Sequence, residues 1–402
     1  MIRTVLLVHN FYQQPGGEDE VFATEARMLE EHGHTVVRYT VHNERITRRG
    51  SLRVAAGTVW SSAAHHELRQ LMQRTRPAVA HFHNTFPLIS PSAYHAARSE
   101  GIPVVQTLHN YRLFCVNAQF YRDGRPCEDC LGLSVPWHGV QHACYRSSRL
   151  ASATVATMVG VHRALGTWKH RVDRYIALTE FARSKCIAGG LPAERVVVKP
   201  NFIHPDPGAG DGAGAYALFV GRLSPEKGVR TLLAAWRRLG NVMPLRVVGD
   251  GPLAAEVRAA QDSNASVCHL GRKTPGEVLE LIGAARCLVC PSEWYEGLPR
   301  VVVESLARGT PVIASRIGSL AELVQHGRTG LHFRAGDSDD LVSQVTRMAA
   351  HSPEYAAMRR AARAEFEARY TEAANYAMLM TIYESVMAPT RATGQDLQDG
   401  QK

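Results

Sequence analysis

Two glutamates, Glu296 and Glu304, lie eight positions apart in the stretch EGLPRVVVE. Gly297, Leu298 and Pro299 stand between them, after an apolar run and before a predicted helix. An ordinary strand-to-helix link of this length needs a Gly or Pro and a capping residue, but no pair of carboxylates. Because free N–H groups at a helix start can bind anionic or hydroxyl oxygens, the stretch predicts a ligand-binding loop.

A pair of cations occurs earlier in the chain, in the loop VGRLSPEKG. Arg222 and Lys227 are spaced to reach the two phosphates of a diphosphate, with Ser224 and Glu226 as their local partners. Read alone, this loop fits a solvated basic turn equally well.

A third loop, NFYQQPGGEDEVF, contains Gly16 and Gly17 just before a predicted helix at 18–31. Two glycines there would let a ligand approach the backbone closely. The pair also fits a plain turn, because the acidic residues 18–20 already complement the helix dipole.

The elements that position these loops alternate between strands and helices. Strands are predicted at TVLLVHN, TVVRYT, AVAHFHN and VVQTLH, and then at YALFVGRL, PLRVVGD, SVCHLG, ARCLVCPS, PVIASR and GLHFRAG. This alternation predicts an α/β protein with parallel sheets covered on both faces. A Pro- and Gly-rich linker at 204–214 separates two doubly wound, Rossmann-like domains. Ligands of such sheets bind beyond the carboxyl ends of the strands, where all three loops lie.

Composition limits the class of protein. The chain has 402 residues and a net charge of +9. Residues 1–205 contain 24 Lys and Arg against 15 Asp and Glu, whereas the remaining residues contain 22 of each kind. No apolar run of about eighteen residues and no signal-peptide pattern occurs. We therefore expect a cytoplasmic enzyme whose excess positive charge is confined to its first domain.

In this order and context, the three loops resemble the pattern of glycosyltransferase family 4, including its two glutamates separated by seven residues. The resemblance extends over nearly the whole chain, through VGDGPL, GSLAELVQHGRTGLHF and the helical end YTEAANYAMLMTIYESV. It implies the GT-B architecture, in which two Rossmann-like domains face each other across a cleft. The implied division is an acceptor-side domain at 1–204, a nucleotide-sugar domain at 205–370, a helix at 371–388 that crosses back, and a tail at 389–402.

The resemblance also implies roles for single residues. Glu304 would bind the ribose of a nucleoside-diphosphate sugar, and Glu296 would bind hydroxyls of the sugar itself. Arg222 and Lys227 would stabilise the departing diphosphate. The donor site would be completed by Gly16, Gly17, Gly249, Gly297, Leu298 and Pro299, although a proline has no N–H to donate.

The family transfers sugars with retention of anomeric configuration and without a catalytic metal, so no catalytic cation is expected. The DxD sequence at 337–339 is accordingly predicted to be a helix cap and an acidic first turn.

His109 is the expected histidine of the reacting centre. It follows the apolar strand in VVQTLHNYRLF. In similar enzymes a histidine at this place lies against the donor sugar, where it orients a hydroxyl or shares developing charge. His81 and His83, in AHFHN, are the alternates, and Asn84 fits a turn cap.

Four of the eight cysteines fall in one segment, namely Cys115, Cys127, Cys130 and Cys144. Their number and the Cys-x2-Cys spacing fit a structural zinc site, which a reducing cytosol favours over two disulfides. Free thiols are the alternative, because the flanking cysteines form no second Cys-x2-Cys. Cys287 and Cys290 lie in a predicted buried strand and are expected to be core residues.

The acceptor is the least specified part of the prediction. In the implied architecture it binds to the first domain, so we expect a glycan or lipid-linked acceptor of polysaccharide or glycolipid assembly. The segment 145–175 alternates small or apolar residues with cations at helical spacing. That pattern fits a basic helix on anionic lipid, at the inner face of a membrane, and equally a core-facing helix with solvated cations.

Three other activities fit parts of the pattern. The glutamate pair argues against a sugar-nucleotide epimerase. A glycogen-type phosphorylase is disfavoured because the sequence shows no context for a pyridoxal-binding lysine. The positive charge alone suggests a basic nucleic-acid-binding protein. Because the sequence contains no base-reading motif, no nucleic-acid partner is expected.

Overall fold

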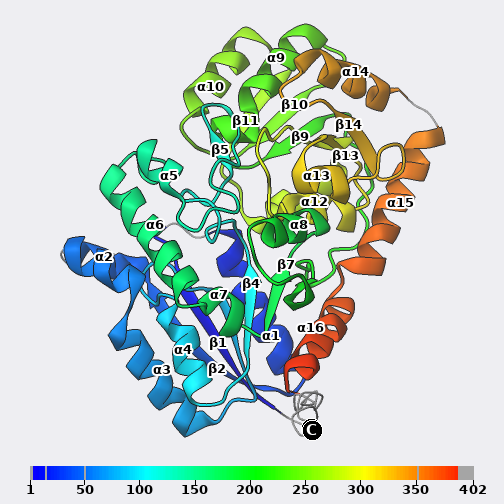
Figure 1. Cartoon of the computed structure of the whole chain (residues 1–402). Coiled ribbons are helices and arrows are strands. Elements are labelled where there is room, and N and C mark those ends of the chain that lie inside the picture. Colours follow the sequence, from blue (N-terminus) through cyan, green and yellow to red (C-terminus); the bar gives the residue numbers. More distant parts are fainter. Residues whose placement is uncertain (1–2, 14–15, 49–50, 351–352, 388–402) are drawn as a thin grey trace, which may run out of the picture.

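Two six-stranded parallel sheets organise the chain into two α/β domains. The computed structural model describes residues 3–13, 16–48, 51–350 and 353–387. Figure 1 shows the domain with the earlier residues below and the second domain above it. The tail predicted at 389–402 lies outside the described residues.

The first sheet has the strand order β2-β1-β3-β4-β7-β8. Six of the eight residues of β1 are buried, as expected of a central strand covered on both faces. The strands are β1 (Thr4–Phe11), β2 (Thr35–His42), β3 (Val79–Asn84), β4 (Val104–Leu108), β7 (Arg174–Ala177) and β8 (Val196–Val198). The helices are α1 (Gly17–Glu31), α2 (Ser51–Val59), α3 (Ser62–Thr75), α4 (Ser92–Ser99), α5 (Trp137–Gln141), α6 (Arg149–Ala164), α7 (Thr167–His170) and α8 (Glu180–Ala188).

The second sheet has the order β11-β10-β9-β12-β13-β14. All four residues of β12 are buried, which confirms that Cys287 and Cys290 are core residues. The strands are β9 (Ala217–Val220), β10 (Leu245–Val248), β11 (Val267–Gly271), β12 (Cys287–Cys290), β13 (Val312–Ser315) and β14 (Gly330–Phe333). The helices are α9 (Val229–Leu239), α10 (Ala254–Ser263), α11 (Pro275–Ala284), α12 (Arg300–Ala307), α13 (Gly318–Leu323), α14 (Ser338–Ala349) and α15 (Pro353–Arg369).

The last helix, α16 (Glu372–Met387), returns to the first domain. Its Leu379, Ile382 and Tyr383 are buried in one cluster with Phe22 and Leu29 of α1. The expected crossing helix is therefore present, and it covers one face of the first sheet.

The basic segment 145–175 is not one helix, so that prediction was wrong. α6 ends at Ala164, and Gly166 follows with a φ of +63°, a conformation that L residues rarely adopt. Arg174 and Tyr175 begin the strand β7. A four-residue strand with a charged first residue is too short to interrupt a helical pattern visibly.

The stretch at 204–214 has no regular structure, but it packs against the second domain. Asp206 pairs with Arg363 of α15 at 2.6 Å. A Cβ atom on Gly210 would lie 2.2 Å from the backbone oxygen of Gly283. The glycine at 210 therefore permits close packing rather than free movement of a linker.

The cysteine-bearing segment follows β4 and contains a two-stranded hairpin, β5 (Tyr121–Arg122) and β6 (Arg125–Pro126). In Figure 1 this segment extends from the first domain toward the second. Its Glu128 accepts a hydrogen bond of 2.7 Å from Lys185 of α8.

Candidate active site

The two domains touch where the loops after β4 and β12 meet. A Cβ atom on Gly297 would lie 3.1 Å from the backbone oxygen of His109. Tyr111 donates a hydrogen bond of 3.4 Å to the backbone oxygen of Glu296. We call this contact of His109 and Tyr111 with Glu296 and Gly297 the interdomain seam. It brings the predicted histidine of the first domain against the predicted loop of the second.

Glu296 and Lys227 form an ion pair next to the seam. Glu296 is 5% exposed, and its Oε1 accepts hydrogen bonds from Lys227 Nζ at 2.7 Å and from Ser292 Oγ at 2.6 Å. Burial lowers the pKa of Lys227, but the charge and the hydrogen bond of Glu296, together with smaller effects of Cys290 and Glu226, raise this pKa above its ordinary value. The residues assigned to the diphosphate and to the sugar thus share one site.

Arg222 is the second cation of the loop after β9, and it is exposed. It forms no ion pair within the part of the chain that the structure describes. Ser224 and Glu226, expected to be partners of the cations, bond to each other instead, with a distance of 2.6 Å. The Arg222 guanidinium is therefore available to an anionic ligand.

Glu304 lies in the second turn of α12, and its side chain is 13% exposed. Burial raises the pKa of this carboxyl group, whereas Arg300, whose Nε lies 2.9 Å from Glu304 Oε1, lowers it. Arg300 also reaches Glu20 of α1 at 3.0 Å, across the two domains. A ligand at Glu304 would thus contact an arginine already held by both domains.

The start of α12 has unused backbone donors. Pro299 is its N-cap residue. The N–H groups of Gly297 and Leu298 bond to no other group of the described residues. The Leu298 side chain is 8% exposed and belongs to the core, so only its backbone is suited to ligand binding.

Gly249 has a packing role. Its φ is +137°, and a Cβ atom there would lie 1.9 Å from the backbone oxygen of Gly221. The loops after β9 and β10 can approach this closely only because the residue is glycine.

Gly16, the N-cap residue, and Gly17, the first residue of α1, border open space: apart from their own neighbours in the chain, no described atom would lie within 4 Å of a Cβ built on either. The neighbouring Glu18, which the sequence analysis treated only as a partner of the helix dipole, is half-buried. Burial raises the pKa of Glu18 to about 7, although hydrogen bonds with Tyr12 and Asn110 lower it. No feature of the sequence distinguishes Glu18 from its acidic neighbours, the buried Asp19 and the exposed Glu20.

His109 is connected to a buried polar network. Its Nε2 lies 3.0 Å from Nδ1 of His83. Nε2 of His83 and Nδ1 of His81 lie 3.2 Å and 3.0 Å from one oxygen of Glu25. Lys199 Nζ lies 2.9 Å from the other oxygen of this carboxylate. His81 and His83, the alternates of the sequence analysis, thus lie beneath His109 and support it.

This network determines which nitrogen of His109 is protonated. Burial lowers the pKa of His83 to about 4 and that of His109 well below its ordinary value, so both rings are neutral at pH 7. Burial raises the pKa of Glu25, but Lys199, His81 and His83 together lower it well below its ordinary value, so the carboxylate is ionised. The ionised carboxylate next to Nε2 of His83 favours a proton on that nitrogen, so Nδ1 of His83 accepts from Nε2–H of His109. Nδ1 of His109 remains as an acceptor for a ligand hydroxyl.

Sequence reasoning missed Glu25 and Lys199. Glu25 follows Val21 and Phe22 at helical spacing on the buried face of α1. A carboxylate on an otherwise apolar helix face is unusual, and this pattern in the sequence could have identified Glu25. The partner Lys199 lies 174 positions away, so no local pattern could connect the two residues.

Two groups of described residues bring three metal-ligand atoms within 4.8 Å of one another, one at Glu25, His81 and His83, the other at Glu31, His204 and Glu372. In the first group Lys199 already balances the charge of Glu25. Asp337 caps α14 by accepting from the N–H groups of Asp339 and Asp340, which confirms the predicted cap.

The comparisons with known proteins agree with this arrangement. The model of "Glycosyltransferase Family 4" matches residues 15–207, and that of "Glycosyl transferases group 1" matches residues 206–365. An uncharacterized glycosyltransferase of Methanocaldococcus jannaschii, MJ1178, is 31% identical over 153 residues, which cover 38% of this chain and 43% of that protein. The lipopolysaccharide 1,2-N-acetylglucosaminetransferase of Salmonella typhimurium is 30% identical over 32% of this chain and 38% of its own length.

These matches span less than half the length of either curated relative. Among solved structures, Anabaena HepE in complex with UDP and glucose superposes with a TM-score of 0.65 and 17% identity, over 95% of this chain and all of that one. This similarity shows the GT-B fold. The two family models together cover the chain from residue 15 to residue 365. One model contains His109 and Tyr111, and the other contains Glu296 and Gly297, so each contributes one side of the interdomain seam. The chain belongs to glycosyltransferase family 4.

Proposed function

We propose that this protein is a retaining glycosyltransferase that moves a sugar from a nucleoside-diphosphate sugar to a glycan or lipid-linked acceptor. The observation that carries the proposal is the Lys227–Glu296 pair at 2.7 Å, in which Glu296 directly precedes Gly297, the residue that meets the His109 backbone at the interdomain seam. Arg222 on the same loop as Lys227 and Glu304 on α12 add a cation and a carboxylate. Anabaena HepE, which has the same fold, was crystallised with UDP-glucose.

The transfer breaks the bond between the anomeric carbon and the diphosphate oxygen, and the electron pair leaves with the diphosphate. An acceptor hydroxyl bonds to the same face of that carbon, and its proton passes to the departing diphosphate. Arg222 and Lys227 stabilise the charge that develops on the diphosphate. Nδ1 of His109 accepts a hydrogen bond from a sugar hydroxyl and holds the donor in place.

A panel of nucleotide sugars tests this function. We expect one base and one sugar to raise the melting temperature of the protein and to be hydrolysed slowly without acceptor. The matched control is the Glu296→Ala/Glu304→Ala variant, which should lose both effects. Stabilisation of the control by the same nucleotide sugar would place the donor elsewhere.

We propose that the reaction needs no divalent metal. The proposal rests on Arg222 and Lys227 as the charge-stabilising groups and on the use of Asp337 as a helix cap. Turnover should persist in excess chelator, in samples whose melting temperature is unchanged. A loss that magnesium or manganese restores would overturn the proposal.

We further propose that the first domain attaches peripherally to an anionic membrane. Seven of the eight exposed large apolar side chains of the described residues fall between 52 and 165, on or beside α2, α5 and α6. These helices lie together on the left of Figure 1. Leu150 and Trp137 are 84% and 52% exposed, and Arg149 is an exposed cation on the same helix as Leu150. No helix among the described residues is both long and apolar enough to span a bilayer.

Sedimentation with vesicles tests this attachment. Vesicles that contain an anionic phospholipid should bind the protein, and neutral vesicles should bind it less. Replacing Leu150 and Trp137 by Ser should weaken binding. The control is Val242→Ser, which removes a 50% exposed side chain of the second domain. Equal binding by both variants would contradict the proposal.

A further inference from the structure

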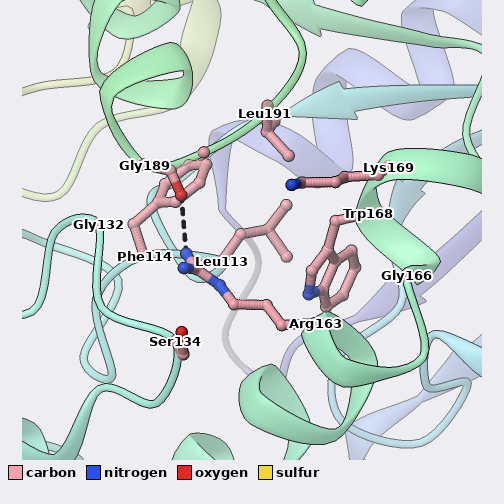
Figure 2. A pocket seen from close by; sticks show the side chains of 11 residues that line it. Leu113, Phe114, Gly132, Ser134, Arg163, Gly166, Trp168, Lys169, Gly189 and Leu191 are labelled. Atoms are coloured by element: carbon pink, nitrogen blue, oxygen red, sulfur yellow. Dashed lines mark hydrogen bonds between the residues drawn. The ribbon is translucent and has the colours of Figure 1, made fainter.

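A cavity of about 320 Å³ opens in the first domain. Its walls come from the turn between α6 and α7, the stretch after α8, the loop after β4 and the cysteine-bearing segment. Figure 2 shows the side chains of Arg163 and Lys169 directed into the space that these walls enclose. A cavity of this size can hold a phosphate group together with a sugar.

The two cations of this cavity have no anionic partner among the residues that the structure describes. Neither Arg163 nor Lys169 forms an ion pair within the residues that the structure describes, and no Asp or Glu is among the residues that line the cavity. Arg163 donates only to the backbone oxygen of Gly189, at 2.8 Å, as Figure 2 shows. Burial lowers the pKa of Arg163, which means that its charge is incompletely solvated. An anion would relieve this cost.

The cavity adjoins the site at His109. A second cavity of about 40 Å³ is lined by His109, Asn110 and Arg112, and also by Leu113 and Trp168. Leu113 and Trp168 line the first cavity as well. The side chains of Leu113 and Trp168 therefore border both the cavity with Arg163 and Lys169 and the space next to His109.

Apolar side chains surround the same part of the surface. Leu165, which directly precedes the lining residue Gly166, is 51% exposed. Val161 is 38% exposed on the last turn of α6. Val135 is 46% exposed, and it adjoins the lining residue Ser134. An anion-binding cavity with exposed apolar neighbours fits a ligand that has both a charged and an apolar part.

We propose that Arg163 and Lys169 bind the phosphate of a lipid-linked acceptor, an ester in which the phosphate joins the sugar to an apolar chain. The phosphate lies in the cavity, the apolar chain lies along Leu165 and Val161, and the sugar extends past Leu113 toward His109. This proposal rests on the proposed function, because it names the acceptor of the same reaction. It assigns the two cations to the acceptor and leaves Arg222 and Lys227 to the donor.

Calorimetric titration with matched probes tests the proposal. The probes are geranyl phosphate with geraniol, and glucose 1-phosphate with glucose. Geranyl phosphate should bind more tightly than geraniol and more tightly than glucose 1-phosphate. Arg163→Gln and Lys169→Gln should each weaken its binding by about tenfold. The control is Arg171→Gln, which removes an exposed cation at the end of α7 outside the cavity and should have no effect.

All titrations are repeated in an Arg222→Ala background, so that phosphate binding at the donor loop cannot account for the result. Arg163→Lys retains the charge and should retain most of the affinity, which controls for folding. Equal affinity for geranyl phosphate and geraniol, or no effect of either Gln variant, would overturn the proposal. Tighter binding of glucose 1-phosphate would overturn the lipid part of it. Nucleotide-sugar binding by the same samples reports separately on the proposed function.

Discussion

Lys227 Nζ lies 2.7 Å from Oε1 of Glu296, and the two side chains are 24% and 6% exposed. The cation that the sequence assigns to the diphosphate is thus already paired with the carboxylate that it assigns to the sugar. Arg222 has no such partner among the described residues. The two cations of one loop therefore differ in their electrostatic surroundings, and their variants should differ too.

Arg222→Ala should reduce turnover about a hundredfold while donor affinity changes by less than about tenfold. Loss of one preorganised charge-stabilising group costs about 3 kcal/mol of transition-state stabilisation, whereas the ground-state diphosphate is already partly solvated. Single-turnover rates and calorimetric donor affinities measure the two effects. Equal losses in both would mean that Arg222 only holds the donor.

Lys227→Ala should weaken donor binding more than Arg222→Ala does. The substitution leaves the buried Glu296 carboxylate without its cation, next to an incoming diphosphate of like charge. Adding Glu296→Gln to Lys227→Ala should therefore recover part of the lost affinity. If the double variant binds donor as weakly as the product of the single losses predicts, the ion pair has no influence on donor binding.

Glu304→Ala should weaken the binding of donor and of free nucleoside diphosphate by the same factor, because a ribose contact is made in both complexes. The control is Glu20→Ala, which removes the other carboxylate partner of Arg300. Calorimetry with both ligands makes the comparison. Unchanged nucleotide affinity in Glu304→Ala, or an equal loss in Glu20→Ala, would contradict the ribose assignment.

Glu18 should make the stability of the protein depend on pH. Its pKa is raised from 4.5 to about 7, so between these values the folded state binds more protons than the unfolded state. Stability from this group is fully present below about pH 4.5 and declines as the pH rises to about 7. Glu18→Gln should flatten the slope in this window. Thermal melts from pH 4.5 to 8 of both proteins test this, and parallel curves would exclude Glu18 as the cause.

Glu25→Gln should destabilise the protein by about 3–5 kcal/mol, because it leaves the Lys199 ammonium buried without its counterion. The double variant Glu25→Gln/Lys199→Met should regain a large part of this loss. Urea denaturation gives the free energies of unfolding. Additive losses would show that the two residues do not act as a pair.

The zinc site remains a prediction, and the structure gives it a location. Cys115, Cys127, Cys130 and Cys144 line one cavity of about 10 Å³, but no three of their sulfur atoms lie within 4.8 Å of one another. Elemental analysis should find about one zinc per chain.

Cys127→Ser/Cys130→Ser should remove this zinc, and the control Cys268→Ser, at an exposed cysteine of β11, should retain it. Freshly purified, reduced protein without zinc would contradict the prediction.

Local patterns determined much of this molecule. The apolar strands, their alternation with helices and the three loops at strand ends are properties of short segments, and burial on both faces of a parallel sheet leaves a continuous apolar run in the sequence. Arg222, Lys227, Glu296 and His109 stand at the end of such a run or close after it, whereas the resemblance to glycosyltransferase family 4 implied their roles and that of Glu304, which lies within α12.

Only the tertiary structure decided how these residues are paired. Lys227 and Glu296 are 69 positions apart, and Glu25 and Lys199 are 174 apart. Their contacts depend on the strand order of each sheet and on the placement of one domain against the other. Periodicity within a segment reports which face is buried, but not which distant residue covers it. The protonated nitrogen of His109 follows from such contacts, and so does the lack of a counterion for Arg163 among the described residues, so both became visible only in three dimensions.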